Sequence, residues 1–107
     1  QGGFLVQSKI LVIDDEEFIT KSLKQHLEKE ECEVVTAATG EDGLEIFKSE
    51  SPDIIILDLN MPGMGGIETL KAIRSLSSEV IIIIITVTMA TINLEQQGVH
   101  GSMYLGG

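Results

Sequence analysis

Three aspartates follow short apolar runs and are the residues in this sequence best suited to chemistry. Asp14 and Asp15 come after residues 9–13, and Asp58 comes after residues 54–57. Carboxylates that lie within a few ångströms repel one another, and a cation relieves that repulsion. All the available ligand atoms are oxygens, which favours Mg²⁺ over zinc, because zinc sites prefer nitrogen and sulfur. The sequence therefore predicts a magnesium site.

These carboxylates converge only if the runs before them are neighbouring parallel strands. Residues 9–13 and 54–57 are short and rich in isoleucine and valine, which is typical of strands buried on both faces. In a parallel sheet, ligands bind outside the carboxyl ends of the strands, where the strand order reverses. A single aspartate there often only caps the next loop or helix. Three at adjacent strand ends favour a binding site.

Strands and helices alternate along the chain. Apolar residues at helical spacing predict helices at residues 16–30 and around residues 67–73. Thr39 and Asp42 resemble a capping box, which predicts that a further short helix begins there, between the two helices just named. Strands are predicted at residues 9–13, 33–37, 54–57 and 80–85, followed by a short helix at 91–97 and a poor fifth strand at 102–105. This alternation predicts an α/β fold with helices on both faces of a parallel sheet.

The composition indicates one acidic domain. The chain has 107 residues and a net charge of −10, which opposes direct binding to nucleic acid or to anionic lipid. Its length supports a single hydrophobic core. Cys32 is the only cysteine, so no disulfide can form within one chain, and no apolar run reaches the roughly 18 to 20 residues of a membrane span. We expect a soluble cytoplasmic protein without membrane contact.

Several motifs together resemble the receiver domain of bacterial two-component response regulators. The matching segments are ILVIDDE at 10–16, PDIIILDLNMPGM at 52–64, Gly66-Ile67 and Ile85-Thr86. The match is strong over residues 9–86 and weak over 87–107. We therefore expect a receiver domain at residues 9–107 after an N-terminal extension of residues 1–8. The resemblance implies a flavodoxin-like, doubly wound sheet with strand order 2-1-3-4-5.

The resemblance also implies roles for particular residues. Asp58 would be the phosphoacceptor, which takes a phosphoryl group from a histidine kinase. Asp15 and Asp58 would bind Mg²⁺ directly, Asp14 through a water molecule, and Asn60 through its backbone carbonyl. The domain would then be a signalling phosphoacceptor and not an enzyme, apart from assisting its own phosphorylation and dephosphorylation.

The end of the sequence departs from the family pattern. Thr86 would donate a hydrogen bond to the phosphoryl group, with Thr88 as the second choice. Family members carry a lysine at the end of the fifth strand, but the last lysine here is Lys71, and Leu105 takes that position. The fifth strand is weak and the last helix of the family is missing. The acceptor half of the site is therefore preserved, whereas the half that responds to phosphorylation is altered.

Two other functions stay open. A receiver-like domain that binds proteins without phosphorylation is favoured by Leu105 and disfavoured by the intact Asp14, Asp15 and Asp58. A hydrolase of the haloacid dehalogenase type would also use a nucleophilic carboxylate. Those enzymes need a second aspartate two residues after the nucleophile, where this sequence has Asn60.

The weak end of the sequence also predicts self-association. Without a sound fifth strand, residues 80–85 would form an exposed strand edge with six consecutive β-branched residues. Without the last helix, the apolar sheet face beside Phe18, Ile19 and Leu23 would be partly uncovered. We therefore expect a homodimer or another self-associated form through the exposed fourth strand or this uncovered sheet face.

Overall fold

Five parallel strands form one sheet, with helices on both of its faces. The computed structural model describes residues 7–61, 63–86 and 101–104. In chain order, its elements are β1 (Lys9–Ile13), α1 (Glu17–Lys29), β2 (Glu33–Ala37), α2 (Gly40–Glu50), β3 (Ile54–Asp58), α3 (Gly66–Leu76), β4 (Ile81–Thr86) and β5 (Gly101–Tyr104). The strand order is β2-β1-β3-β4-β5, and every neighbouring pair is parallel. The predicted alternation and strand order are confirmed.

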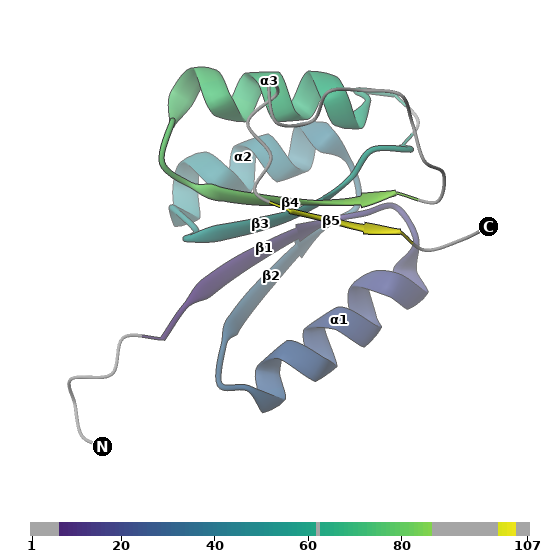
Figure 1. The fold of residues 1–107 in the computed structure, drawn as a ribbon, viewed down its shortest axis with the longest axis vertical. Helices are drawn as coiled ribbons and strands as arrows, with labels where there is room; N and C mark the ends of the chain where they lie inside the picture. The colour runs from purple at the N-terminus through teal and green to yellow at the C-terminus, as the bar shows by residue number, and fades with distance from the viewer. Residues whose placement is uncertain (1–6, 62, 87–100, 105–107) are drawn as a thin grey trace.

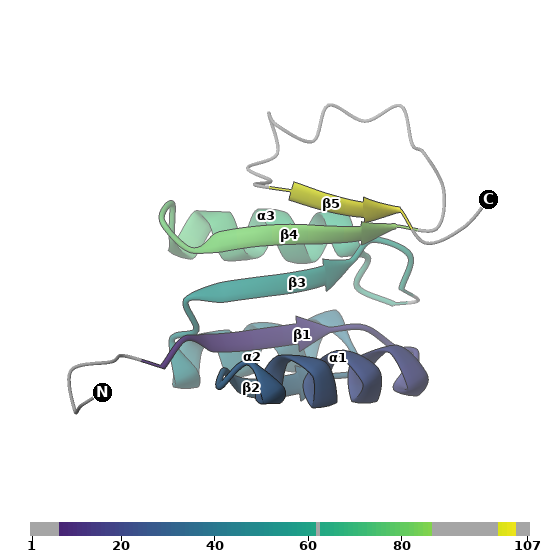
Figure 2. The ribbon, with the colours of Figure 1, turned by 60° about the horizontal axis from the view of Figure 1, so that its bottom comes forward.

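The two faces of the sheet are covered by different helices. Helices α2 and α3 lie side by side on one face, and α1 lies on the other (Figures 1 and 2). Because side chains alternate along a strand, β1, β2, β3 and β4 each supply residues to both layers. The α2–α3 layer contains Leu11, Ile13, Ile55, Leu57, Ile82 and Ile84, and the α1 layer contains Ile10, Val12, Val34, Ile56 and Ile85. The core is therefore two apolar layers on a sheet whose carboxyl edge is left for polar residues.

Local signals explain where the helices begin. The Thr39 hydroxyl accepts a hydrogen bond from the Asp42 backbone N–H at 3.0 Å, so Thr39 caps α2 as predicted. In the first turn of α3, the Glu68 carboxylate accepts a hydrogen bond from the Gly65 N–H at 3.1 Å. Both helices start on the side of the sheet where the strands end, and this brings their first turns close to the aspartates.

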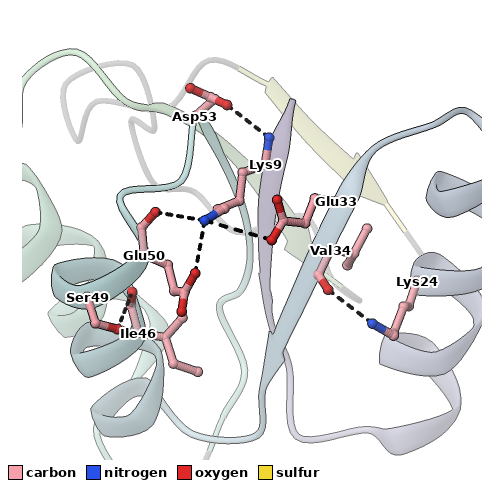
Figure 3. Close-up of polar contacts among 8 residues, drawn as sticks. All are labelled: Lys9, Lys24, Glu33, Val34, Ile46, Ser49, Glu50 and Asp53. Carbon is pink, nitrogen blue, oxygen red and sulfur yellow. Dashed lines mark hydrogen bonds and ion pairs between the residues drawn. The ribbon is translucent and has the colours of Figure 1, made fainter. Parts of the chain in front are cut away.

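A polar cluster connects several elements at the amino edge of the sheet, which is opposite the edge with the three aspartates (Figure 3). The Lys9 ammonium lies 2.9 Å from Glu50 Oε1 and 3.8 Å from Glu33 Oε2, and the Lys9 backbone N–H donates to Asp53 Oδ2 at 2.9 Å. The hydrogen bond with Glu50 raises the pKa of Lys9 above its ordinary value. This cluster connects β1, β2, the end of α2 and the start of β3, far from the carboxyl edge.

The expectation of an exposed fourth strand is wrong. Strand β5 pairs in parallel with β4, from Ile83 opposite Gly101 to Thr86 opposite Tyr104. In the described part of the sheet, the two outer strands are therefore β2 and β5, and β4 lies inside. Backbone hydrogen bonds need no particular side chains, so a short strand with a poor sequence can still cover the apolar β4.

Some sequence-based expectations fall outside the described residues. They concern the short helix at 91–97, Thr88 and Leu105. Among the helices that the structure describes, none has the length and apolar character needed to cross a membrane.

Candidate functional site

The carboxyl ends of β1 and β3 bring the three aspartates together. The two strands are neighbours, with Ile13 opposite Leu57, so the residues that follow these positions share one edge. One carboxylate oxygen from each of Asp14, Asp15 and Asp58 lies within 4.8 Å of the other two. The predicted convergence is therefore present in the structure, and it arises from the parallel register of two strands.

The three carboxylates differ in exposure. Asp14 is 3% exposed and Asp58 is 7% exposed, whereas Asp15 is an exposed residue. The Glu16 backbone N–H donates to Asp14 Oδ1 at 2.9 Å, and the Asn60 backbone N–H donates to Asp58 Oδ1 at 2.9 Å. Aspartates often accept such bonds from the residue two positions ahead. Each buried carboxylate is thus oriented by the loop that leaves its strand.

Negative charge accumulates at this edge of the sheet. Burial, together with the charges of Asp58 and Asp15, raises the pKa of Asp14 to about 6, and the bond from the Glu16 N–H opposes this shift. Within the described residues, none of the three carboxylates takes part in an ion pair. A group of oxygen ligands with excess negative charge fits a hard divalent cation such as Mg²⁺.

A pocket of about 310 Å³ opens beside this cluster. Asp14 and Asp15 line it together with Thr20 and Lys21 of α1 and with Ala38, which follows β2. Thr20 and Lys21 were not predicted from the sequence as residues near the site. The available signal was that α1 begins directly after the aspartates, which places its first two turns over the same edge.

A larger pocket of about 550 Å³ lies at the opposite edge of the sheet. It is lined by residues that include Phe47, Pro52, Leu76 and Val80, and by none of the three aspartates. A choice of the site by pocket volume alone would therefore select the amino edge of the sheet, away from the three aspartates. The chemistry of the side chains places the candidate site at the carboxyl edge.

The loop after β3 and the end of β4 place Asn60 and Thr86 near Asp58. Asn60 is an exposed residue of the loop after β3, and its N–H already contacts the Asp58 carboxylate. Thr86 is the last residue of β4 and follows Ile85, which pairs with Asp58. The backbone therefore brings both predicted residues to the same edge as the carboxylates.

A doubly wound parallel sheet with an acidic cluster at its switch point defines the class of this protein. Residues 10–103 match the sequence profile of the response regulator receiver domain. The chain belongs to this family, and its sheet is the flavodoxin-like one that the resemblance implied.

Curated relatives support the assignment. The chain is 44% identical over 69 residues to the alkaline phosphatase synthesis transcriptional regulatory protein PhoP of Bacillus subtilis, which covers 64% of this chain and 29% of PhoP. It is 37% identical over 82 residues to sporulation initiation phosphotransferase F of the same organism, covering 77% of this chain and 66% of that protein. The chain thus spans from under a third to just under two thirds of the length of these relatives.

Solved structures share the fold. The response regulator protein TrrA of Thermotoga maritima, solved in complex with Mg²⁺ and BeF, has a TM-score of 0.85 and 34% identity, over 92% of this chain and 87% of its own. A CheY-like receiver domain protein of Methanospirillum hungatei has a TM-score of 0.88 and 29% identity, over 92% of this chain and 82% of its own.

Proposed function

We propose that this domain is a cytoplasmic signalling phosphoacceptor, in which Asp58 takes a phosphoryl group from the phosphohistidine of a histidine kinase with the help of Mg²⁺. The observation that carries the proposal is the convergence of Asp14, Asp15 and Asp58 at the carboxyl edge of a receiver fold. Asp15 and Asp58 would bind the cation directly, Asp14 through water, and Asn60 through its carbonyl. We propose that this receiver domain covers residues 9–107.

The hydrogen bonds around Asp58 support an assignment of its two oxygens. Oδ1 accepts the Asn60 N–H, so we assign Oδ2 as the nucleophile. An Oδ2–phosphorus bond forms while the bond from phosphorus to the imidazole nitrogen breaks. The imidazole leaves with the electron pair of the broken bond, and it leaves as a neutral ring when its other nitrogen carries and keeps a proton. Mg²⁺, when bound, neutralises negative charge on the carboxylates and on the phosphoryl oxygens.

Other residues of the chain would hold the phosphorylated state. Thr86 would donate a hydrogen bond from its hydroxyl to a phosphoryl oxygen, and its place directly after the partner of Asp58 supports this role. Thr88 is the second choice. Burial of Asp58 limits the access of water to the new acyl phosphate, which favours a lifetime suited to signalling.

A phosphodonor experiment tests this function. The protein is treated with Mg²⁺ and a small phosphodonor such as acetyl phosphate, and modification of Asp58 is read by mass spectrometry. We expect one phosphoryl group on the wild-type chain and on the control Asp53→Asn, and none on Asp58→Asn. Asp53 is a suitable control because it is an exposed aspartate at the amino edge.

The same experiment separates the alternatives. If Mg²⁺ binds but Asp58 stays unmodified, the domain is a protein-binding module, as the leucine at position 105 suggests. Repeated release of phosphate from small phosphate esters would instead indicate a hydrolase. We expect neither result, because the three carboxylates needed for phosphoryl acceptance are in place, whereas a second catalytic aspartate after Asp58 is absent from the sequence.

We also propose that two copies of the domain associate through the sheet face on the α1 side. Phe18 in α1 is 77% exposed and Ile81 in β4 is 41% exposed, and Ile54 and Ile83 are only partly buried. Among the described helices, only α1 packs on this face (Figure 2). The net charge of −10 opposes unspecific aggregation, which favours a defined dimer.

A further inference from the structure

The first residue of α3 lies against the backbone that carries Asp58. A Cβ atom placed on Gly66 would be 2.6 Å from the Asp58 carbonyl oxygen and 2.9 Å from the Leu59 carbonyl carbon, and closer still to the Leu59 Cα. All these atoms belong to the backbone, so no side-chain rotation could relieve the overlap. Gly66 therefore permits a close contact between α3 and the end of β3. The Cβ atom of any other residue would push these two elements apart.

The preceding glycine has no such constraint. A Cβ on Gly65 would meet only Glu68 Oε1, at 3.9 Å, and the Gly65 backbone has an ordinary negative φ of −70°. Two adjacent glycines thus differ sharply in what surrounds them. Only the second is required for the close approach to Asp58.

The start of α3 cannot retreat from β3 without disturbing other packing. Thr69 is fully buried, and both its hydroxyl and its backbone N–H donate to the Gly65 carbonyl at 2.9 Å. On the far side of Thr69 lies Gly40, the first residue of α2, where a Cβ would meet the Thr69 hydroxyl and lie 3.0 Å from the Met64 carbonyl oxygen. The first turn of α3 is therefore held between α2 and the end of β3.

We propose that Gly66 is a positioning residue for the phosphoacceptor. Its contact with the Asp58 and Leu59 backbone fixes the loop that leaves β3, and this loop presents the Asn60 N–H to Asp58 Oδ1. The inference rests on the proposed function in that it takes Asp58 as the acceptor and the Asn60 carbonyl as a ligand of the cation. A Cβ at position 66 would displace Leu59 and Asn60 relative to the Asp58 carboxylate.

The test compares Gly66→Ala with the matched control Gly65→Ala. The first measurement needs no cation: hydrogen exchange of the Asn60 amide, followed by NMR in the metal-free protein. We expect exchange about tenfold faster in Gly66→Ala, because the bond to Asp58 is lost, and within about twofold of wild type in Gly65→Ala. The second measurement is Mg²⁺ affinity, which we expect to fall about tenfold in Gly66→Ala only.

An effect of Gly66→Ala on the stability of the whole domain must be distinguished from an effect on the position of the loop after β3. Gly43→Ala serves for this, because its Cβ would press on Ile13 Cδ1 at 2.5 Å, in the core and away from the loop after β3. We expect it to lower the free energy of unfolding while Asn60 exchange under native conditions stays within about twofold of wild type. Unchanged Asn60 exchange and unchanged Mg²⁺ affinity in folded Gly66→Ala would overturn the inference.

Should Gly66→Ala fail to fold, Thr69→Val takes its place. This substitution keeps the volume and removes the hydroxyl that donates to the Gly65 carbonyl. We expect Asn60 exchange about threefold faster, and no change would overturn the inference. Failure of the proposed function is distinguishable, since it would show as a wild-type chain that does not accept phosphate on Asp58, whereas the metal-free exchange measurement decides the role of Gly66.

Discussion

Asp14 and Asp58 bring carboxylate oxygens from two neighbouring strands to within 4.8 Å of each other, although both side chains are almost completely buried. The parallel pairing of Ile13 with Leu57 enforces this approach, because the next residues along both chains then share one edge. Two buried like charges destabilise the folded state unless a proton or a cation compensates them. The site therefore lowers the free energy of unfolding of the metal-free protein.

Replacing Asp14 by asparagine should stabilise the metal-free domain near neutral pH. The pKa of Asp14 is raised from 3.8 to about 6, so the folded state holds this proton more tightly than the unfolded chain. The contribution of Asp14 to stability is then fully present below pH 3.8 and is lost as the pH rises towards about 6. We expect Asp14→Asn to raise the free energy of unfolding at about pH 7.5 by about 1–2 kcal/mol, measured by urea denaturation.

The control for this measurement is Asp42→Asn, an exposed aspartate in the first turn of α2. It should change the free energy of unfolding by no more than about 0.5 kcal/mol, in the destabilising direction, because it removes a favourable charge at a helix start. Equal stability of wild type and Asp14→Asn at both pH 5 and pH 7.5 would contradict the raised pKa.

Binding of Mg²⁺ should weaken as the pH falls. Protonation of Asp14 below about pH 6 removes negative charge from the site, so we expect the apparent affinity to decline between about pH 7 and pH 5. Isothermal titration or NMR titration at several pH values measures this. Asp15→Asn and Asp58→Asn should each abolish detectable binding, because each removes an anionic ligand. Full affinity in both variants would rule out the assigned site.

Phosphorylation of Asp58 should produce only a small conformational change. A switch needs contacts that differ between its two states, and the family lysine that would contact the phosphoryl group has no counterpart after Lys71. Thr86 would supply one such contact. Backbone NMR spectra with and without acetyl phosphate test this, with a receiver domain that carries the lysine measured in parallel. Shifts as large and as widespread as in the domain with the lysine would show that the chain switches without this residue.

Self-association should depend on the apolar residues of the α1 face. We expect wild-type protein to sediment as a dimer at high micromolar concentration, and Ile81→Lys combined with Phe18→Ser to sediment as a monomer. Leu76→Ser is the matched control, because Leu76 is 54% exposed but lies in α3, on the opposite side of the sheet. A wild-type monomer under the same conditions would overturn the proposed dimer.

Particular residues show how far the sequence could predict this structure. Strands β1 and β2 begin and end where expected, because charged residues and turns border short apolar runs. The convergence of Asp14 and Asp58 was predictable, since parallel strands end at one edge. The place of β5 beside β4 followed only from the strand order of the family, because the pairing depends on backbone hydrogen bonds and the sequence of residues 102–105 gives little signal for a strand. The contact of Gly66 with Asp58 could not be predicted, because a glycine at the start of a helix looks the same in the sequence whether the space around it is open or filled.

The place of β1 between β2 and β3 allows an order of events during synthesis of the chain. Although β1 is the first strand made, it pairs with β2 on one side and with β3 on the other. The nascent chain can therefore close β1, α1 and β2 into a unit while the other edge of β1 waits for β3, which ends at Asp58. The repulsion between Asp14 and Asp58 begins only when that second half docks. Carboxylate repulsion would therefore act when β3 docks against β1, and a divalent cation that bound at this step would offset it.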